Sequence, residues 1–119
     1  MPWLRWIEWF SGRPKGPLAP NMAITLVTLR IAASAGRDEV SFYRSAEYEA
    51  LVEWAKMGRF VLALASTDRD ELTLLCIQSP EEMHREIAGL PLVAAGLATF
   101  DIRPVMSLKV GDDEYTALQ

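Results

Sequence analysis

The chain has 119 residues, the length of a single domain. Half of the residues are hydrophobic and 24% are charged, a composition typical of a compact fold rather than a disordered chain. A formal net charge of −4 gives no electrostatic reason to bind nucleic acid or an anionic lipid surface, and one cysteine with one histidine falls short of the usual zinc ligand sets.

We expect a cytoplasmic protein that does not span a membrane. No apolar run reaches the roughly 18–20 residues that a bilayer-spanning helix needs. The first residues lack the basic start, the long apolar stretch and the small-residue cleavage site of a secretion signal. The single cysteine, Cys76, cannot form an internal disulfide, and its apolar neighbours predict an inert buried thiol.

Residues 1–21 form a segment of their own, which is first aromatic and then rich in Pro and Gly. Four large apolar side chains recur at helical spacing, at Trp3, Trp6, Ile7 and Phe10. The Pro- and Gly-rich stretch that follows predicts an extended linker. A helix of about ten residues is marginal alone in water, so we expect this aromatic arm to dock on its own domain or on a neighbouring subunit. Anchoring at a membrane surface is the alternative, although the aromatic stretch carries only one Arg and no Lys.

Residues 22–108 are predicted to form one α+β domain, and residues 109–119 a polar tail. The pattern of apolar residues predicts strands over residues 23–31, 60–65, 71–78 and 97–102 and helices over residues 39–57 and 80–88. The expected buried stripe of the first helix is Tyr43, Ala46, Ala50, Trp54 and Met57. Gly58 is the expected C-cap of this helix, Ser79 and Pro80 are typical of the start of the second helix, and Pro104 is expected to stop the last strand.

The order strand–helix–strand–strand–helix–strand is that of the ferredoxin-like split βαβ fold. It predicts a four-stranded antiparallel sheet with both helices on one face. The second strand is apolar on both sides, so the open face of the sheet is expected to pack against a second copy of the chain. The sequence thus predicts a homo-oligomer built by sheet-to-sheet packing.

Four short stretches resemble the muconolactone isomerase family over roughly residues 40–106. They are Met57-Gly58-Arg59-Phe60, Ser79-Pro80-Glu81-Glu82-Met83-His84, Gly89-Leu90-Pro91-Leu92 and Phe100-Asp101-Ile102-Arg103-Pro104-Val105. The resemblance implies a dimeric α+β barrel and isomerisation of a small lactone acid without a cofactor or metal. The strand over residues 61–65 carries no ionisable side chain and the loop over residues 93–96 is small and apolar, where the family has polar-tipped or aromatic residues. The expected substrate is therefore larger or more apolar than a small dicarboxylate-derived lactone.

Two residues are candidates for moving a proton. His84 is the only histidine, and imidazole is the natural general acid or base near neutral pH; the alternative is a plain surface histidine, because its neighbours Met83 and Ile87 look buried. Asp101 shares a strand face with Arg103, and Arg30 is expected to approach Asp101 from the adjacent strand. Either arginine is a candidate to bind a substrate carboxylate or enolate oxygen; the alternative is an interface salt bridge.

Three aromatic residues, Tyr43, Trp54 and Phe60, are candidates to line an apolar substrate pocket between helices and sheet. Aromatic residues at helical spacing are also typical of plain core.

Three functions stay open at this point. The first is a cofactor-independent isomerase or cyclase acting on a small apolar lactone- or polyketide-like substrate. The second is a cofactor-free monooxygenase on the same fold. The third is a non-catalytic ligand-binding or assembly subunit, favoured by the absence of ionisable groups on the second strand.

Overall fold

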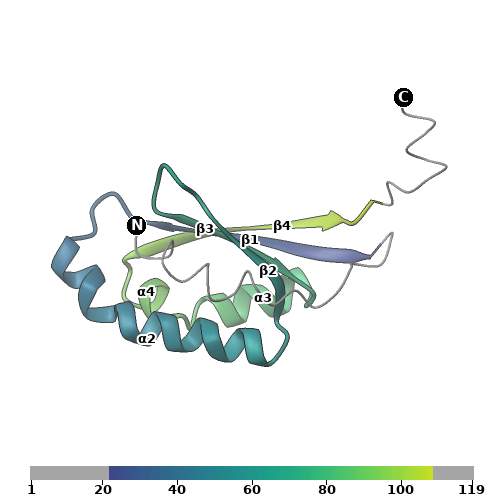
Figure 1. Cartoon of the computed structure of the whole chain (residues 1–119), viewed down its shortest axis with the longest axis horizontal. Coiled ribbons are helices and arrows are strands. Elements are labelled where there is room, and N and C mark those ends of the chain that lie inside the picture. Colours follow the sequence, from purple (N-terminus) through teal and green to yellow (C-terminus); the bar gives the residue numbers. More distant parts are fainter. Residues whose placement is uncertain (1–21, 109–119) are drawn as a thin grey trace.

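The computed structural model describes residues 22–108, which form a four-stranded antiparallel sheet with all of the helices on one face (Figure 1). The predicted aromatic arm over residues 1–21 and the predicted tail over residues 109–119 lie outside the described residues. The elements in chain order are β1 Ala23–Ile31, α2 Arg37–Lys56, β2 Phe60–Ala65, β3 Glu71–Cys76, α3 Pro80–Ile87, α4 Pro91–Ala94 and β4 Ala98–Met106. This confirms the predicted α+β class and element order, with the short helix α4 added after α3.

The strands lie in the order β2-β3-β1-β4, and every neighbouring pair is antiparallel. The arrangement is consistent with a ferredoxin-like fold, in which the central strand β1 separates β3 from β4. Arg30 of β1 lies opposite Glu71 of β3 and Thr99 of β4. The predicted pairing of the first and last strands is therefore confirmed.

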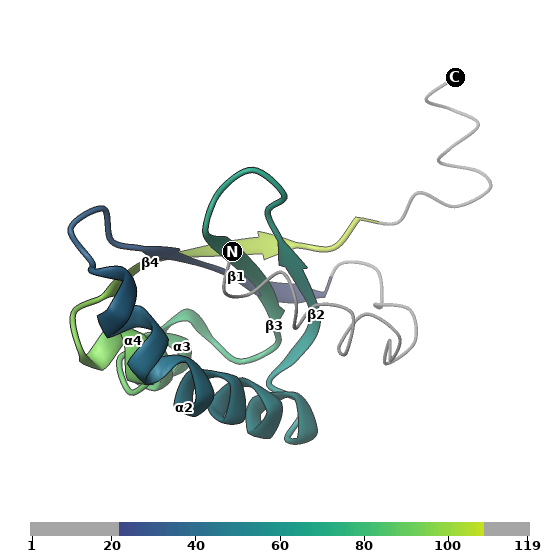
Figure 2. The ribbon, with the colours of Figure 1, turned by 60° about the vertical axis from the view of Figure 1, so that its left-hand side comes forward.

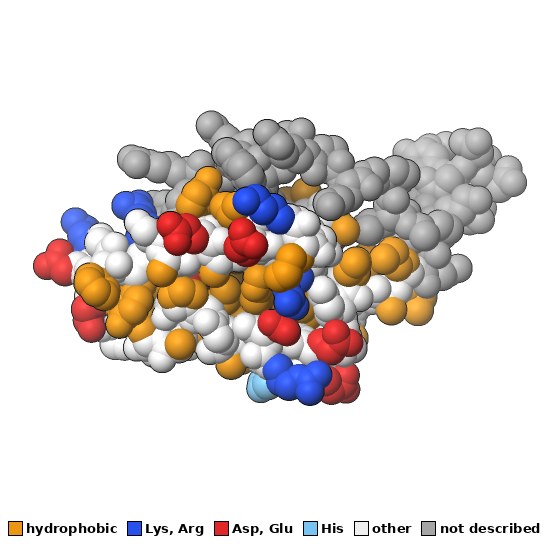
Figure 3. Space-filling view, turned by 90° about the horizontal axis from the view of Figure 1, so that it is seen from below, with side chains coloured by type: hydrophobic (Ala, Val, Ile, Leu, Met, Phe, Trp, Pro, Cys, Tyr) orange, Lys and Arg blue, Asp and Glu red, His pale blue; other side chains and the backbone are white. Residues whose placement is uncertain are grey.

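The core lies between the sheet and the helices. Alternate residues of the two central strands face the helices and are almost completely buried: Val27, Leu29, Leu72, Leu74 and Cys76. Helix α2 contributes Leu51, and the amphipathic helix α3 contributes Met83 and Ile87, each with no exposed surface. Figure 2 shows the helices beneath the sheet, and Figure 3 shows the helix-bearing side as a band of hydrophobic side chains with charged side chains toward its edges.

The buried stripe of α2 is rotated from the predicted one. Ala46 is exposed and Met57 is 56% exposed, so both are wrong as core positions. The fully buried residues of the helix are instead Glu47, Leu51 and Trp54. Glu47 was not among the expected core residues, and its burial shifts the stripe by one residue from the predicted Ala46.

Glycine closes the two helix ends that precede strands. Gly58 has φ of +72° and follows the C-cap Met57, where the N–H of Arg59 donates to the carbonyl of Trp54 at 2.9 Å. Gly96 has φ of +76° at the end of α4 and makes the same kind of turn. This pattern is the Schellman motif, which a glycine in the left-handed region permits. The predicted end of the helix at Gly58 is confirmed, although the C-cap is Met57 and Gly58 is the residue that follows it.

The last strand does not stop at Pro104. Strand β4 runs on to Met106, with Pro104 opposite Thr25 of β1. Proline lacks the backbone N–H donor. On the outer side of an edge strand such as β4 no neighbouring strand needs that donor, so a proline is tolerated there. The expectation that Pro104 ends the strand was wrong, because an edge strand can accommodate a proline.

Replacement of the buried Met83 by Ala should lower the free energy of unfolding by about 2–5 kcal/mol, because it leaves a cavity in the core. The exposed neighbour Arg85 is the matched control, and Arg85→Ala should change stability by no more than about 0.5 kcal/mol. Urea unfolding of the two variants measures the difference. Equal stability of both variants would contradict the assignment of Met83 to the core.

Candidate functional site

The face of the sheet opposite the helices is the principal candidate site. No helix of the described residues covers it, as the edge-on view in Figure 1 shows. It carries an apolar patch, defined here as Leu26, Leu62, Leu64 and Leu75. Leu62 is 40% exposed and Leu64 is 50% exposed, although both belong to a wholly apolar strand. Beside the patch is a concave region of about 390 Å³ lined mainly by polar side chains.

An arginine joins three strands at this concave region. The Nε of Arg30 donates to Oε1 of Glu71 at 2.6 Å, and its Nη1 donates to Oδ2 of Asp101 at 2.6 Å. The strand register explains the contact, because Glu71 lies directly opposite Arg30 and Asp101 lies opposite Thr28 on the same face. The hydrogen bond to Asp101, followed by that to Glu71, raises the pKa of Arg30 above its ordinary value. The predicted approach of Arg30 to Asp101 is thus confirmed.

The second predicted arginine lies on the same face. Arg103 is exposed, lines the concave region, and has no carboxylate partner within residues 22–108. It lies opposite Leu26 of the apolar patch in the β1–β4 register. The hydroxyls of Thr28 and Thr73 lie 3.4 Å apart between the strands. Among the described residues, the face therefore offers one guanidinium without a carboxylate partner and two hydroxyl groups next to apolar surface.

His84 lies on the other side of the sheet from Asp101. It is exposed on α3, and its ring meets the ring of Phe100 edge to face, with 5.4 Å between centroids. Phe100 faces the helices, so the next residue, Asp101, faces away from them. A groove of about 470 Å³ runs past His84 and Ile102. The two predicted proton-transfer residues are not brought into one site.

The three aromatic candidates belong to the core. Trp54 is 7% exposed and Phe60 is 5% exposed, and Tyr43 is half-buried against the same core. All three pack on the helix side of the sheet, away from Arg30 and Arg103. The structure therefore gives them the role of plain core and does not bring them together with the arginines.

A buried carboxyl group escaped the sequence analysis. Glu47 of α2 has no exposed surface, and its Oε1 accepts a hydrogen bond from the backbone N–H of Leu92 at 3.0 Å. Its Oε2 has no partner among the described residues. Burial raises the pKa of Glu47 to about 7, against a smaller lowering by the Leu92 hydrogen bond. The sequence feature that could have identified Glu47 as buried is its spacing, because it lies four residues after Tyr43 and four before Leu51 on the buried stripe.

The lone cysteine is buried as predicted. Cys76 has no exposed surface, and burial raises the pKa of its thiol to about 12. A thiol that stays protonated at neutral pH is a poor nucleophile.

The chain matches no model of a known protein family, and no curated protein is significantly similar to it in sequence. The resemblance to the muconolactone isomerases stays a prediction. Within residues 22–108 no three His, Cys, Asp or Glu side chains are grouped so as to hold a metal ion. Over the same residues no helix has both the length and the apolar character needed to cross a bilayer.

The buried Glu47 should make the stability of the protein depend on pH. Its pKa is about 7 in the folded chain against an ordinary value of 4.5, so the unfolded chain loses this proton first as the pH rises. Protonated Glu47 therefore makes its full contribution to the free energy of unfolding below pH 4.5. As the pH rises toward 7 this contribution is lost, and the free energy of unfolding falls by about 3 kcal/mol. Denaturant unfolding across this range measures it.

In Glu47→Gln this part of the pH dependence should disappear, because an amide does not titrate. Glu49→Gln changes an exposed residue of the same helix and should keep the wild-type dependence. An unchanged pH profile in Glu47→Gln would show that Glu47 does not titrate in this way.

Proposed function

We propose that two copies of this chain pack through the open faces of their sheets and enclose a chamber that binds a small, largely apolar molecule with a carboxylate or carbonyl oxygen. The observation that carries the proposal is the apolar patch beside Arg103, on a sheet face that no described helix covers. Sheets bury apolar faces against another layer, and large exposed patches are typical of interaction sites. A second copy supplies the missing layer without any further partner.

Arg103 is the residue best suited to bind the oxygen. Arg30 already holds two carboxylates, whereas Arg103 has no carboxylate partner within residues 22–108. A guanidinium in a chamber closed to water binds a carboxylate or an enolate oxygen far more strongly than it does in solution. The leucines of the patch would hold the apolar body of the ligand.

We further propose that the reaction is a proton transfer, as an isomerase or cyclase acting on a lactone- or polyketide-like substrate requires. In this mechanism Asp101 takes a proton from the carbon next to a carbonyl, which leaves an enolate with its oxygen at Arg103. Asp101 then returns the proton to a different carbon, so no cofactor or oxidant is consumed. The hydrogen bond from Arg30 keeps Asp101 in place at the edge of the concave region.

A non-catalytic binding or assembly subunit is the second candidate. It is favoured by β2, whose six residues include no ionisable side chain and whose leucines face outward. Such a strand contributes contact area and no chemistry. Binding without turnover would support this alternative.

Leu64→Glu should dissociate the proposed dimer, because it places a charge within the apolar patch. The matched control is Met57→Glu at the end of α2, which is 56% exposed and away from the open face. Sedimentation equilibrium should give a dimer for the wild type and for Met57→Glu, and a monomer for Leu64→Glu. A monomeric wild-type chain would overturn the proposal.

The proton transfer can be tested by deuterium exchange into muconolactone and into a longer-chain alkyl analogue, followed by NMR. Asp101→Asn should slow exchange by about 100-fold or more, because a carboxylate acting as a base contributes on that scale. Arg103→Gln should slow it as well, and Asp68→Asn, an exposed carboxylate of the β2–β3 hairpin, should not.

His84→Ala should retain full exchange activity, since His84 lies on the opposite side of the sheet. Loss of exchange in His84→Ala with full activity in Asp101→Asn would reverse the assignment. Saturable binding of both compounds with no exchange by the wild type would replace the isomerase by the non-catalytic function.

A further inference from the structure

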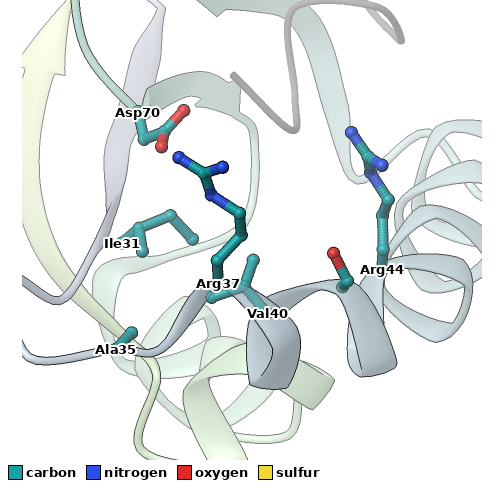
Figure 4. Close-up of a pocket in the computed structure, with 7 residues that line it drawn as sticks. Ile31, Ala35, Arg37, Val40, Arg44 and Asp70 are labelled. Atoms are coloured by element: carbon teal, nitrogen blue, oxygen red, sulfur yellow. The ribbon is translucent and has the colours of Figure 1, made fainter.

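A second hollow lies at the far end of β1, on the helix side of the sheet. It has a volume of about 480 Å³ and lies between the end of β1, the first turns of α2 and the start of β3 (Figure 4). Volumes of roughly 300–1,000 Å³ are typical of sites for small ligands. None of its lining residues belongs to the candidate site on the open face.

One side of the hollow is a row of polar side chains from α2. Arg37, Ser41 and Arg44 are spaced by four and three residues, which places all three on one face of the helix. Neither arginine has a carboxylate partner in an ion pair within residues 22–108, whereas Arg30 is paired twice. Arg37 also lies in the first turn of a 20-residue helix, where the helix dipole favours a negative charge.

The other sides of the hollow are formed by apolar side chains and one carboxylate. Ile31 and Val40 supply an apolar wall continuous with the core. Asp70 adds a carboxylate, and in Figure 4 the guanidinium of Arg37 points toward it while that of Arg44 stands apart. The lining residues include two arginines and one aspartate, an excess of one positive side chain. This excess suits a ligand with one negative charge.

We propose that this hollow binds a small organic monocarboxylate. Its carboxylate lies at Arg44 and the hydroxyl of Ser41, Arg37 adds positive charge, and its short apolar chain lies against Ile31 and Val40. The site does not depend on the proposed dimer or on the proposed isomerase reaction, because it uses neither the apolar patch nor Arg103.

Titration of the full chain with hexanoate, followed by ¹H–¹⁵N NMR, tests the proposal. Hexanoate should shift the amide signals of Ser41 and Arg44 saturably, and hexanol and inorganic phosphate should each bind at least about tenfold more weakly, since a charge-assisted hydrogen bond has about that effect on an affinity. Arg44→Gln should weaken hexanoate binding by about tenfold or more, and Arg37→Gln by less. Arg85→Gln, an exposed arginine of α3, should leave it unchanged.

Three results would overturn the proposal. The first is no saturable shift with hexanoate. The second is equal weakening in Arg85→Gln and Arg44→Gln, which means non-specific charge attraction. The third is loss of hexanoate binding in Arg103→Gln with full binding in Arg44→Gln, which would place the ligand on the open face.

Discussion

The alternation of side chains across a sheet that has helices on only one face is the constraint on which the structure depends. Each strand must present one set of residues to the helices and the other set to the opposite side. On β1 and β3 the first set is Val27, Leu29, Leu72, Leu74 and Cys76, and it forms the core. The second set mixes leucines with an ion-paired cluster, and no described helix covers it. The need to bury those leucines is the physical reason for the proposed dimer.

The same alternation divides the residues that carry chemistry between two separate places. Asp101, Arg30 and Arg103 share the open face, whereas His84 rests against Phe100 on the helix side. A mechanism that uses both His84 and Asp101 on one substrate therefore conflicts with the fold. The charged cluster is exposed in the single chain, where water screens it and it adds little to stability. Closing the face with a second copy would remove that water and strengthen each polar contact with a bound molecule.

The sequence predicted most of the architecture because strand and helix periods leave direct traces in it. The bounds of β1 and β2 agree with the prediction, and the contact between Arg30 and Asp101 followed from period-two alternation and the pairing of β1 with β4. Pro104 gave a wrong strand end, because proline usually interrupts a strand but is tolerated in an edge strand such as β4. Glu47 was missed because the hydrogen bond from the backbone N–H of Leu92, 45 residues away, lets a carboxyl group occupy a core position. The hollow at Arg37 and Arg44 was also missed, since it needs the end of β1 and the start of β3 to come together.

Intermolecular NOEs in a sample that mixes two differently labelled copies test the central claim most directly. If the open faces pack together, methyl groups of Leu62, Leu64 and Leu75 in one copy should show NOEs to methyl groups of the same patch in the other copy. Methyl groups of the helix side, such as that of Met57, should show none. Intermolecular NOEs confined to the helix side, or none at any concentration, would contradict the account.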